Sequence, residues 1–382
     1  MADLNFTISP NIILGAYASF RLGLAAKNWG NRYMVIVDPI LKEIAKLDTI
    51  FNSLTTRGVN YIVFDRITSG PDSETIQDAL QLARKSYIQG VIAIGGSSIQ
   101  SIGRVVSSLY NETKSIYNYI DGDVPETEPL PFISIPSKAI SEFGFSDNVP
   151  IVDARIRQCR ILKINADVCK LAVFDASLPT FLPPNQSGAV SLELLCLACE
   201  AYLSQKASFF SDMFAEKTFS LLNGYLDSPE KSISLGSHED LLSQVGCLAS
   251  LATGLASIGP ASLLALTIRT QYGIPRSLTT AIILPCMLED LRSYKAEKIA
   301  TISKQLGFAE QTADTEEAIT RLIEGIRQKM ALMKLPTRLK ELSLSMEELT
   351  VAVEDAGQLE LINNMPRSMA TGDLFTLMKS SF

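Results

Sequence analysis

The chain has 382 residues, of which 47% are hydrophobic and 20% charged, and it carries 34 basic residues against 41 acidic ones. This length suffices for two domains, and the high apolar content excludes disorder as the dominant state. The net charge of -7 and the lack of a basic run disfavour nucleic acid as a partner, because phosphate binding needs a concentrated basic surface.

The numbers of histidines and cysteines narrow the function further. The single histidine, His238, stands in a Gly-Ser-His-Glu-Asp segment that predicts a helix start at the surface, so a mechanism built on imidazole is nearly excluded. The six cysteines lack the spacing of a disulfide framework, and the first residues lack the pattern of a signal peptide. The sequence therefore predicts a cytoplasmic protein with reduced cysteines.

Short apolar runs alternate with amphipathic stretches in the first half of the chain. The predicted elements, in chain order, are a strand at 33–37, a helix at 39–57, a strand at 61–64, a helix at 73–87 and strands at 90–94 and 132–135. This alternation is typical of an α/β domain with a parallel, Rossmann-like sheet. Two further runs, 154–163 and 171–174, are interpreted as a ribbon that returns to the sheet.

A proline-rich segment ends the strand pattern, and we place the domain boundary there, with residues 1–182 before it and 183–382 after it. Apolar residues then recur at helical spacing, which predicts an all-helical domain. Its expected helices are 192–203, 212–225, 239–258, 261–272, 279–291, 315–333 and 346–354. The charge-free stretch 241–268 is long enough to cross a bilayer. Because it is broken at Gly259-Pro260, we interpret it as two buried core helices that meet at a kink, with no membrane partner.

A glycine turn between a strand and a helix predicts an anion site. Gly95 and Gly96 follow the strand 90–94, and Ser97 and Ser98 lead into a helix. Glycines let a phosphate approach the backbone, and the start of the helix supplies free N–H groups and the positive end of its dipole. A purely structural strand-to-helix turn is the alternative.

Eight short segments follow one another along nearly the whole chain. They are Val35-Ile36-Val37-Asp38, Ile94-Gly95-Gly96-Ser97-Ser98, Ile135-Pro136-Ser137, Asp175-Ala176-Ser177-Leu178-Pro179, Glu200-Ala201-Tyr202, Ile274-Pro275-Arg276, Ala281-Ile282-Ile283-Leu284-Pro285 and Asn364-Met365-Pro366-Arg367. In order and spacing this set resembles the iron-containing (group III) alcohol dehydrogenases, whose fold is that of dehydroquinate synthase. The resemblance implies an N-terminal domain that binds a nicotinamide dinucleotide and a helical domain that holds a divalent metal.

The resemblance also implies which residues stand at the metal ligands. Glu193 falls on the carboxylate ligand of the family's D-A-L-x-H segment and Leu197 on its first histidine. Ser262 falls on the second histidine ligand, Leu266 on a nearby pocket histidine, and Arg276 on the third histidine ligand. This set contains no imidazole, and a guanidinium repels a cation. We therefore expect no bound metal and assign no catalytic residue.

Loss of a metal would leave Glu193 as an uncompensated charge. We predict that the Arg276 guanidinium enters the former metal space and pairs with Glu193, with Ser262 as a further acceptor. The alternative is that Arg276 turns to solvent and Glu193 is hydrated. A less favoured candidate is a soft-metal site on one helix, made of Glu193, Cys196, Cys199 and Glu200. Cysteines at such positions are more often small buried hydrophobic residues.

On the cofactor side, the resemblance assigns the binding residues Asp38, Gly95, Gly96, Ser97, Ser98, Ser137 and Lys138. Asp38 would accept from a ribose hydroxyl and so favours NAD(H) over NADP(H), although it fits a helix N-cap equally well. Ser101 replaces a family acid, and Ile140 and Glu142 replace two glycines of the T-T-A-G-T-G-S-E loop. Because these changes crowd and repel a pyrophosphate, which Lys138 offsets in part, NAD binding is expected to be weak.

Two functions remain open. The first is a metal-less, catalytically silent family member that keeps the fold and residual NAD binding, as a binding or regulatory subunit; it is preferred because acid-base and Lewis-acid groups are missing at every matched position. The second is an active NAD-dependent, metal-independent oxidoreductase of a small alcohol or aldehyde that uses Lys138, Arg276 or Tyr202 as its electrophile or acid. A nucleotide or small-molecule ligand is the expected partner, and the resemblance implies a homo-oligomer, a dimer.

Overall fold

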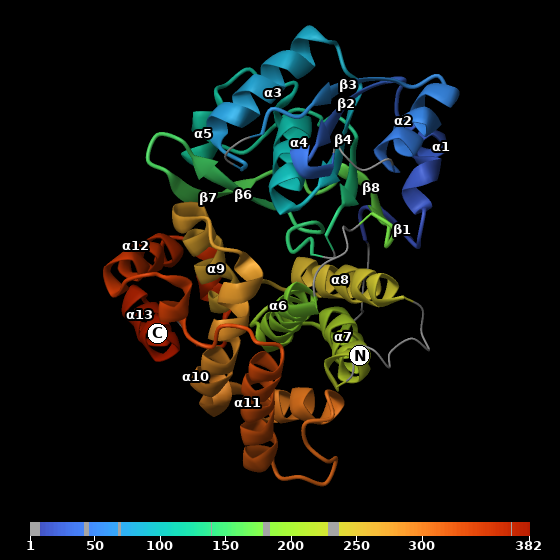
Figure 1. Cartoon of the computed structure of the whole chain (residues 1–382). Helices are drawn as coiled ribbons and strands as arrows, with labels where there is room; N and C mark the ends of the chain where they lie inside the picture. Colours follow the sequence, from blue (N-terminus) through green and yellow to red (C-terminus); the bar gives the residue numbers. More distant parts are fainter. Residues whose placement is uncertain are drawn as a thin grey trace, which may run out of the picture. The chain divides into compact units, whose positions relative to one another are not determined.

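The computed structural model describes residues 8–41, 46–67, 70–138, 140–178, 184–227, 237–367 and 369–382. The chain divides into two compact units, Met1–Thr180 and Phe181–Phe382. The boundary predicted after residue 182 lies outside the described residues. In Figure 1 the first unit runs from blue to green and combines strands with helices, whereas the second runs from yellow-green to red and is helical.

The first unit is built on a six-stranded parallel sheet with the order β1-β8-β5-β4-β2-β3. Its strands are β1 (Asn11–Leu14), β2 (Arg32–Val37), β3 (Asn60–Phe64), β4 (Gly90–Gly95), β5 (Phe132–Pro136) and β8 (Cys169–Phe174). The predicted parallel sheet is confirmed. β2, β4 and β5 are almost wholly apolar and buried, as expected of parallel strands that are covered on both faces.

Alternate side chains of each strand enter two separate cores. Met34 and Ile36 of β2 face one core, whereas Val35 and Val37 face the other, because successive side chains of a strand point to opposite faces. The first core is covered by α3 (Ser73–Lys85), α4 (Ser97–Leu109) and α5 (Ile116–Ile120), and the second by α1 (Leu22–Ala26) and α2 (Lys46–Thr56). Figure 1 shows these helices on the two sides of the strands. The unit therefore has three layers.

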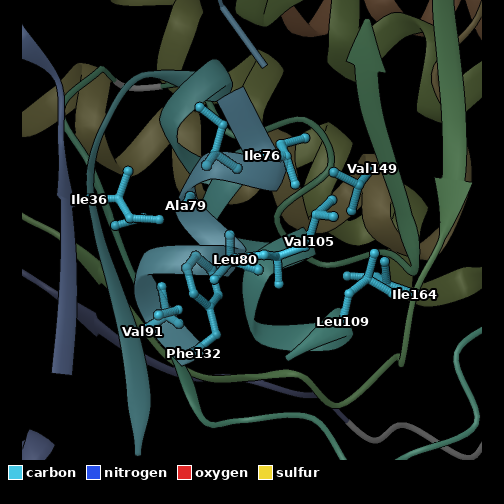
Figure 2. Packing of buried hydrophobic residues seen from close by; sticks show 14 of the residues in the cluster. Ile36, Ile76, Ala79, Leu80, Val91, Val105, Leu109, Phe132, Val149 and Ile164 are labelled. Atoms are coloured by element: carbon cyan, nitrogen blue, oxygen red, sulfur yellow. The ribbon is translucent and has the colours of Figure 1, made fainter. Parts of the chain in front are cut away.

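The helix after β4 packs closely on the sheet. Figure 2 shows Val105 and Leu109 of α4 in the same cluster as Val91 and Phe132 of the sheet. A Cβ atom on Gly103 would stand 2.7 Å from the Phe132 ring, so the glycine allows this approach. This packing fixes the position of the start of α4 relative to the ends of the strands.

Of the two segments predicted to form a ribbon that returns to the main sheet, only one joins that sheet. Residues 171–174 do lie in the main sheet, as part of β8. By contrast, β7 (Gln158–Lys163) pairs antiparallel with β6 (Asn148–Asp153) in a separate two-stranded sheet. Leu162 packs in the core formed with α3 and α4, so the two strands cover those helices and do not extend the sheet.

Two predicted helices of the first unit differ in extent. The predicted helix 39–57 contains a 3-10 turn, η2 (Pro39–Leu41), and then α2 from Lys46; residues 42–45 lie outside the described residues. α3 ends at Lys85, two residues early, and Tyr87 stands at a φ of 49°, in the left-handed region that does not continue a helix.

The second unit is helical throughout its described part, as predicted. Its helices are α6 (Pro184–Leu203), α7 (Phe209–Asp227), α8 (His238–Leu255), α9 (Pro260–Tyr272), α10 (Arg276–Gln305), α11 (Thr315–Leu332), α12 (Met346–Gly357) and α13 (Thr371–Ser381). α13 was not predicted, and α10 is longer than expected: it continues through Pro285 and breaks from helical geometry only at Lys295. His238 opens α8, as predicted, and its side chain is half-buried.

α8 and α9 confirm the interpretation of the charge-free stretch. The two helices meet at an angle of 104°, with Gly259 as the N-cap of α9 and Pro260 as its first residue, where a missing N–H is tolerated. Leu251, Leu263 and Leu264 are buried. Within the described ranges no single helix is long and apolar enough to cross a membrane, and only the bent α8–α9 pair reaches that length and composition.

Candidate functional site

The connections of the parallel sheet reverse direction between β2 and β4. From β2 the chain continues to β3 on one side, and from β4 it continues to β5 on the other. α2 and α4, which follow these two strands, pack on opposite faces of the sheet. In open α/β sheets ligands bind at the carboxyl ends of the strands that flank such a reversal. Asp38 directly follows β2 and Gly95 ends β4, so both lie at this point.

Backbone contacts hold the ends of three strands together at this edge. Asp38 donates its N–H to Ile94 O at 3.0 Å, and Ser137 donates its N–H to Gly95 O at 3.1 Å. A Cβ on Gly95 would stand 2.5 Å from Ile99 Cγ1 and 3.0 Å from Asp38 Cβ, so only glycine fits between the strand end and α4. The structure thus brings Asp38, Gly95 and Ser137 together.

The start of α4 lies beside an exposed cation. Gly96 is the N-cap, in extended conformation, and Ser97 and Ser98 are the first two residues of the 13-residue helix. A Cβ on Gly96 would stand 3.9 Å from Lys138 Cδ, and Lys138 is exposed. Free N–H groups, the positive end of the dipole and an ammonium group together fit an anion such as a phosphate.

Asp38 also has a local structural role. Its Oδ1 accepts the N–H of Ile40 at 3.2 Å, and its carbonyl accepts the N–H of Leu41 at 2.9 Å. The N-cap interpretation is therefore confirmed for the turn η2. The half-buried side chain still lies next to Gly95, and its contact with a ribose remains a prediction.

A buried arginine holds the loop that follows β5. The Arg104 side chain on α4 donates from Nη1 to Phe143 O at 2.7 Å and to Asn148 O at 3.0 Å, and from Nη2 to Ser146 O. Arg104 is 3% exposed, and this burial lowers the pKa of its guanidinium to about 10, which still leaves it charged at neutral pH. Its planar fork of donors suits three carbonyls, which a lysine at this position in the family motif would not match.

The loop and α4 enclose a cavity of about 20 Å³, roughly the space of one water molecule. Its polar lining includes Ser97, Ser101, Arg104, Ser134, Ser141 and Glu142. Glu142 is 2% exposed, so its side chain is enclosed between the loop and the helix. Gln100 closes one wall, donating to Gly95 O at 3.1 Å and accepting from the Ser134 hydroxyl at 2.8 Å. The sequence pattern had indicated no role for Gln100 or Ser134.

In the helical unit the predicted pairing of Arg276 with Glu193 is confirmed. Arg276 Nη2 lies 3.5 Å from Glu193 Oε1, and each side chain is 6% exposed. Arg276 is the first residue of α10 and Glu193 lies in α6, so the pair joins two helices. The alternative, in which Arg276 turns to solvent, is wrong. Ser262 donates its backbone N–H to Glu200 Oε1 at 3.0 Å, and its role as an acceptor for Arg276 stays a prediction.

Glu200 is a second buried carboxylate on α6. It is fully buried against the start of α9, where a Cβ on Gly259 would stand 3.1 Å from its Cγ and Cδ atoms. Burial raises the pKa of Glu200, and hydrogen bonds from the first residues of α9 act in the opposite direction. The positive end of the α9 dipole therefore partly compensates this carboxylate.

The described residues give no support to the soft-metal candidate on α6. In the described part of the chain, no three or more His, Cys, Asp and Glu side chains are grouped so that they could hold a metal ion. Burial raises the pKa of the thiols of Cys196 and Cys199 well above the ordinary range. Burial thus favours the protonated thiols, as expected of small buried hydrophobic residues.

Two models of one protein family together match almost the whole chain. Residues 9–176 match the family model described as iron-containing alcohol dehydrogenase, and residues 188–382 match that of the C-terminal domain of the same family. The chain belongs to the iron-containing alcohol dehydrogenase family.

Relatives in this family are similar over almost their full length. Long-chain-alcohol dehydrogenase 1 of Geobacillus thermodenitrificans is 24% identical over 358 residues, which cover 91% of this chain and 89% of the relative. The crystal structure of a 1,3-propanediol oxidoreductase has a TM-score of 0.91 at 18% identity and covers 99% of both chains. Sulfoacetaldehyde reductase from Bifidobacterium kashiwanohense, solved in complex with NAD+, has a TM-score of 0.83 at 16% identity and covers 99% of this chain and 98% of that one. These likenesses confirm the predicted fold.

The family's metal positions can now be compared with the donors present. The resemblance places Glu193, Leu197, Ser262 and Arg276 of this chain at those positions, and this assignment stays a prediction. They supply one carboxylate that is already paired with a guanidinium, a fully buried leucine and a serine. Divalent zinc or iron sites draw on several imidazole, thiolate or carboxylate ligands, so these donors do not fit such an ion.

Proposed function

We propose that this member of the iron-containing alcohol dehydrogenase family retains a weak NAD site, works without the family's metal, and is catalytically silent or strongly altered as a dehydrogenase. The observation that carries this proposal is the buried pair of Arg276 and Glu193 at two of the four matched ligand positions. A fixed guanidinium 3.5 Å from the carboxylate repels a divalent cation. Without a bound metal ion, no Lewis acid is present to polarise the oxygen of an alcohol.

The cofactor half of the proposal rests on the point of reversal in the sheet. A nicotinamide dinucleotide, when bound, supplies hydride transfer. The backbone N–H groups at Ser97 and Ser98 and the ammonium of Lys138 would hold its phosphates, and the missing side chain of Gly96 leaves room for them. Asp38 would select NAD(H) by accepting from a ribose hydroxyl and repelling a 2'-phosphate.

A second candidate is an active, metal-independent oxidoreductase that acts on a small alcohol or aldehyde. It is favoured by the intact glycine turn with Lys138 beside it and by the activities in the names of the relatives. Tyr202 gives it less support as an acid, because the phenol donates to Glu216 Oε1 at 3.0 Å and Lys298 lies over the ring. These contacts with Glu216 and Lys298 give the Tyr202 side chain a structural role within the helical unit.

Assembly and compartment are part of the same proposal. A homodimer follows from the family resemblance, with a nucleotide or small molecule as the ligand. A cytoplasmic location is supported by the six cysteines, which all lie in described residues and carry thiols without a disulfide. Light scattering of the purified chain measures the assembly.

Metal analysis combined with cofactor titration tests the function. The chain is expressed in medium supplemented with iron and zinc, purified without chelators, and measured by elemental analysis and by calorimetric titration with NADH and NADPH. We expect well under one metal ion per chain, weak binding of NADH and still weaker binding of NADPH. One metal ion per chain contradicts the metal-free proposal, and tight NADPH binding contradicts the role of Asp38. NADH-dependent turnover of an aldehyde without metal favours the second candidate.

A further inference from the structure

We propose that Glu142 determines which ligands the first turns of α4 accept. Its enclosed carboxylate excludes phosphate groups and favours neutral groups that donate hydrogen bonds, such as an amide or a hydroxyl. This inference rests on the proposed dinucleotide site and explains what limits it. Four observations carry it: the burial of Glu142, the shared cavity, the contacts that fix the loop, and the field of α4.

Glu142 lies against the same face of α4 as the start of the anion site. It shares its cavity with Ser97, the first residue of the helix, and with Ser101, one turn further on. Since the cavity holds about one water molecule and Glu142 is 2% exposed, little solvent reaches the carboxylate itself. The negative charge therefore acts at short range on any ligand there.

The charge cannot move away without breaking the loop. Arg104 binds the carbonyls of Phe143, Ser146 and Asn148, which lie one to six positions after Glu142. Gly144 also donates its N–H to Ser141 O at 2.7 Å, which closes a tight turn around Glu142. Glu142 is thus held facing α4 by contacts on both sides of it in sequence.

The positive end of α4 already has an anion from its own chain. The backbone N–H groups at Ser97 and Ser98 and the ammonium of Lys138 favour a negative group near them. Glu142 uses part of this field permanently, so an incoming phosphate meets a weakened attraction and a like charge. A neutral donor meets the carboxylate as an acceptor instead. The expected selectivity is therefore for hydrogen-bond donors over anions.

The test separates charge from size. Binding of NADH and of inorganic pyrophosphate is measured by calorimetry for the parent chain, Glu142→Gln, Glu142→Gly and the control Glu128→Gln. Glutamine removes the charge and keeps the volume, whereas glycine removes both and restores the residue type at this position of the family loop. Glu128 is exposed in the same unit, so its change alters the net charge equally. Circular dichroism and thermal midpoints confirm that each variant is folded.

We expect pyrophosphate and NADH to bind about tenfold more tightly to both Glu142 variants and unchanged to Glu128→Gln. Unchanged pyrophosphate binding in Glu142→Gln overturns the inference, and so does a gain seen only with glycine, since that gain reflects size. Equal NADH affinity of the parent and Glu142→Gln also overturns it and leaves the NAD proposal standing. A gain for pyrophosphate with no NADH binding to any variant supports the inference and overturns the NAD proposal.

Discussion

Arg276 and Glu193 compensate each other inside the helical unit, and this makes a testable prediction about stability. Arg276→Ala is expected to lower the free energy of unfolding by about 3–5 kcal/mol, because it leaves the Glu193 charge buried and unpaired. Replacing Arg276 by Met and Glu193 by Leu together should recover much of the loss. Urea unfolding of the four proteins in a double-mutant cycle measures the coupling.

A surface pair in the same unit provides the control. Arg321 and Glu317 stand four residues apart on α11, with side chains 47% and 43% exposed. Arg321→Ala should change the free energy of unfolding by under about 1 kcal/mol, since water screens such a pair. If the effects of changing Arg276 and Glu193 are simply additive, the two residues are not coupled and the assignment of the pair is wrong.

Glu200 makes stability depend on pH. Because burial raises the pKa of this carboxyl in the folded chain, its protonated form favours folding, and the contribution is lost as pH rises above the usual glutamate range. Glu200→Gln should remove this loss, since the amide oxygen still accepts the N–H of Ser262. The free energy of unfolding of the two proteins is measured by urea unfolding between pH 5 and pH 8. Its change with pH reports the difference in bound protons between the folded and unfolded states. A parent chain that gains stability relative to Glu200→Gln with rising pH contradicts the raised pKa.

At the scale of single elements, the first turn of α3 depends on a cap. Asp72 accepts from the Thr75 N–H at 2.8 Å and from its hydroxyl at 2.9 Å. Asp72→Ala is expected to lower the free energy of unfolding by about 1 kcal/mol. Asp78→Ala removes the same charge from an exposed position in the middle of the helix and should change it by under about 0.5 kcal/mol. Equal effects of the two changes would show that charge, not capping, is responsible.

Elements with a strong local signal were predictable from the sequence, and elements defined by a distant partner were not. β2, β4 and β5 are continuous apolar runs, which indicate buried strands without any knowledge of their neighbours. β1 has four residues and becomes a strand through pairing with β8, about 160 positions later. β6 contains Pro150, which usually argues against a strand but is tolerated in a two-stranded sheet at an edge.

Some features of the candidate site were likewise predictable from local sequence, and others were not. The glycine turn and the acid after β2 are readable because each is a local motif, and parallel strands bring their carboxyl ends to one edge. The contacts of Arg104 with residues about 40 positions away and of Glu200 with α9 depend on packing between distant segments. No spacing in the sequence encodes these contacts.

At the scale of the whole molecule, the burial of α8 and α9 predicts how the protein behaves on extraction. Leu251, Leu263 and Leu264 pack inside the helical unit and are not left for lipid. We therefore expect the full chain to be recovered from lysed cells without detergent and to remain in the supernatant after ultracentrifugation. Recovery only from the membrane fraction would revive the reading of residues 241–268 as a broken membrane span.

The buried pair of Arg276 and Glu193 also constrains how this sequence can change over generations. Changing either residue alone leaves its partner's charge unpaired among helices that exclude water, so we expect single substitutions to lower stability and the amount of folded protein in the cell. Replacement of Arg276 by histidine alone is one such substitution, so we expect it to destabilise the chain unless Glu193 changes as well. We therefore expect sequences that descend from this chain either to retain both residues of the salt bridge or to replace both.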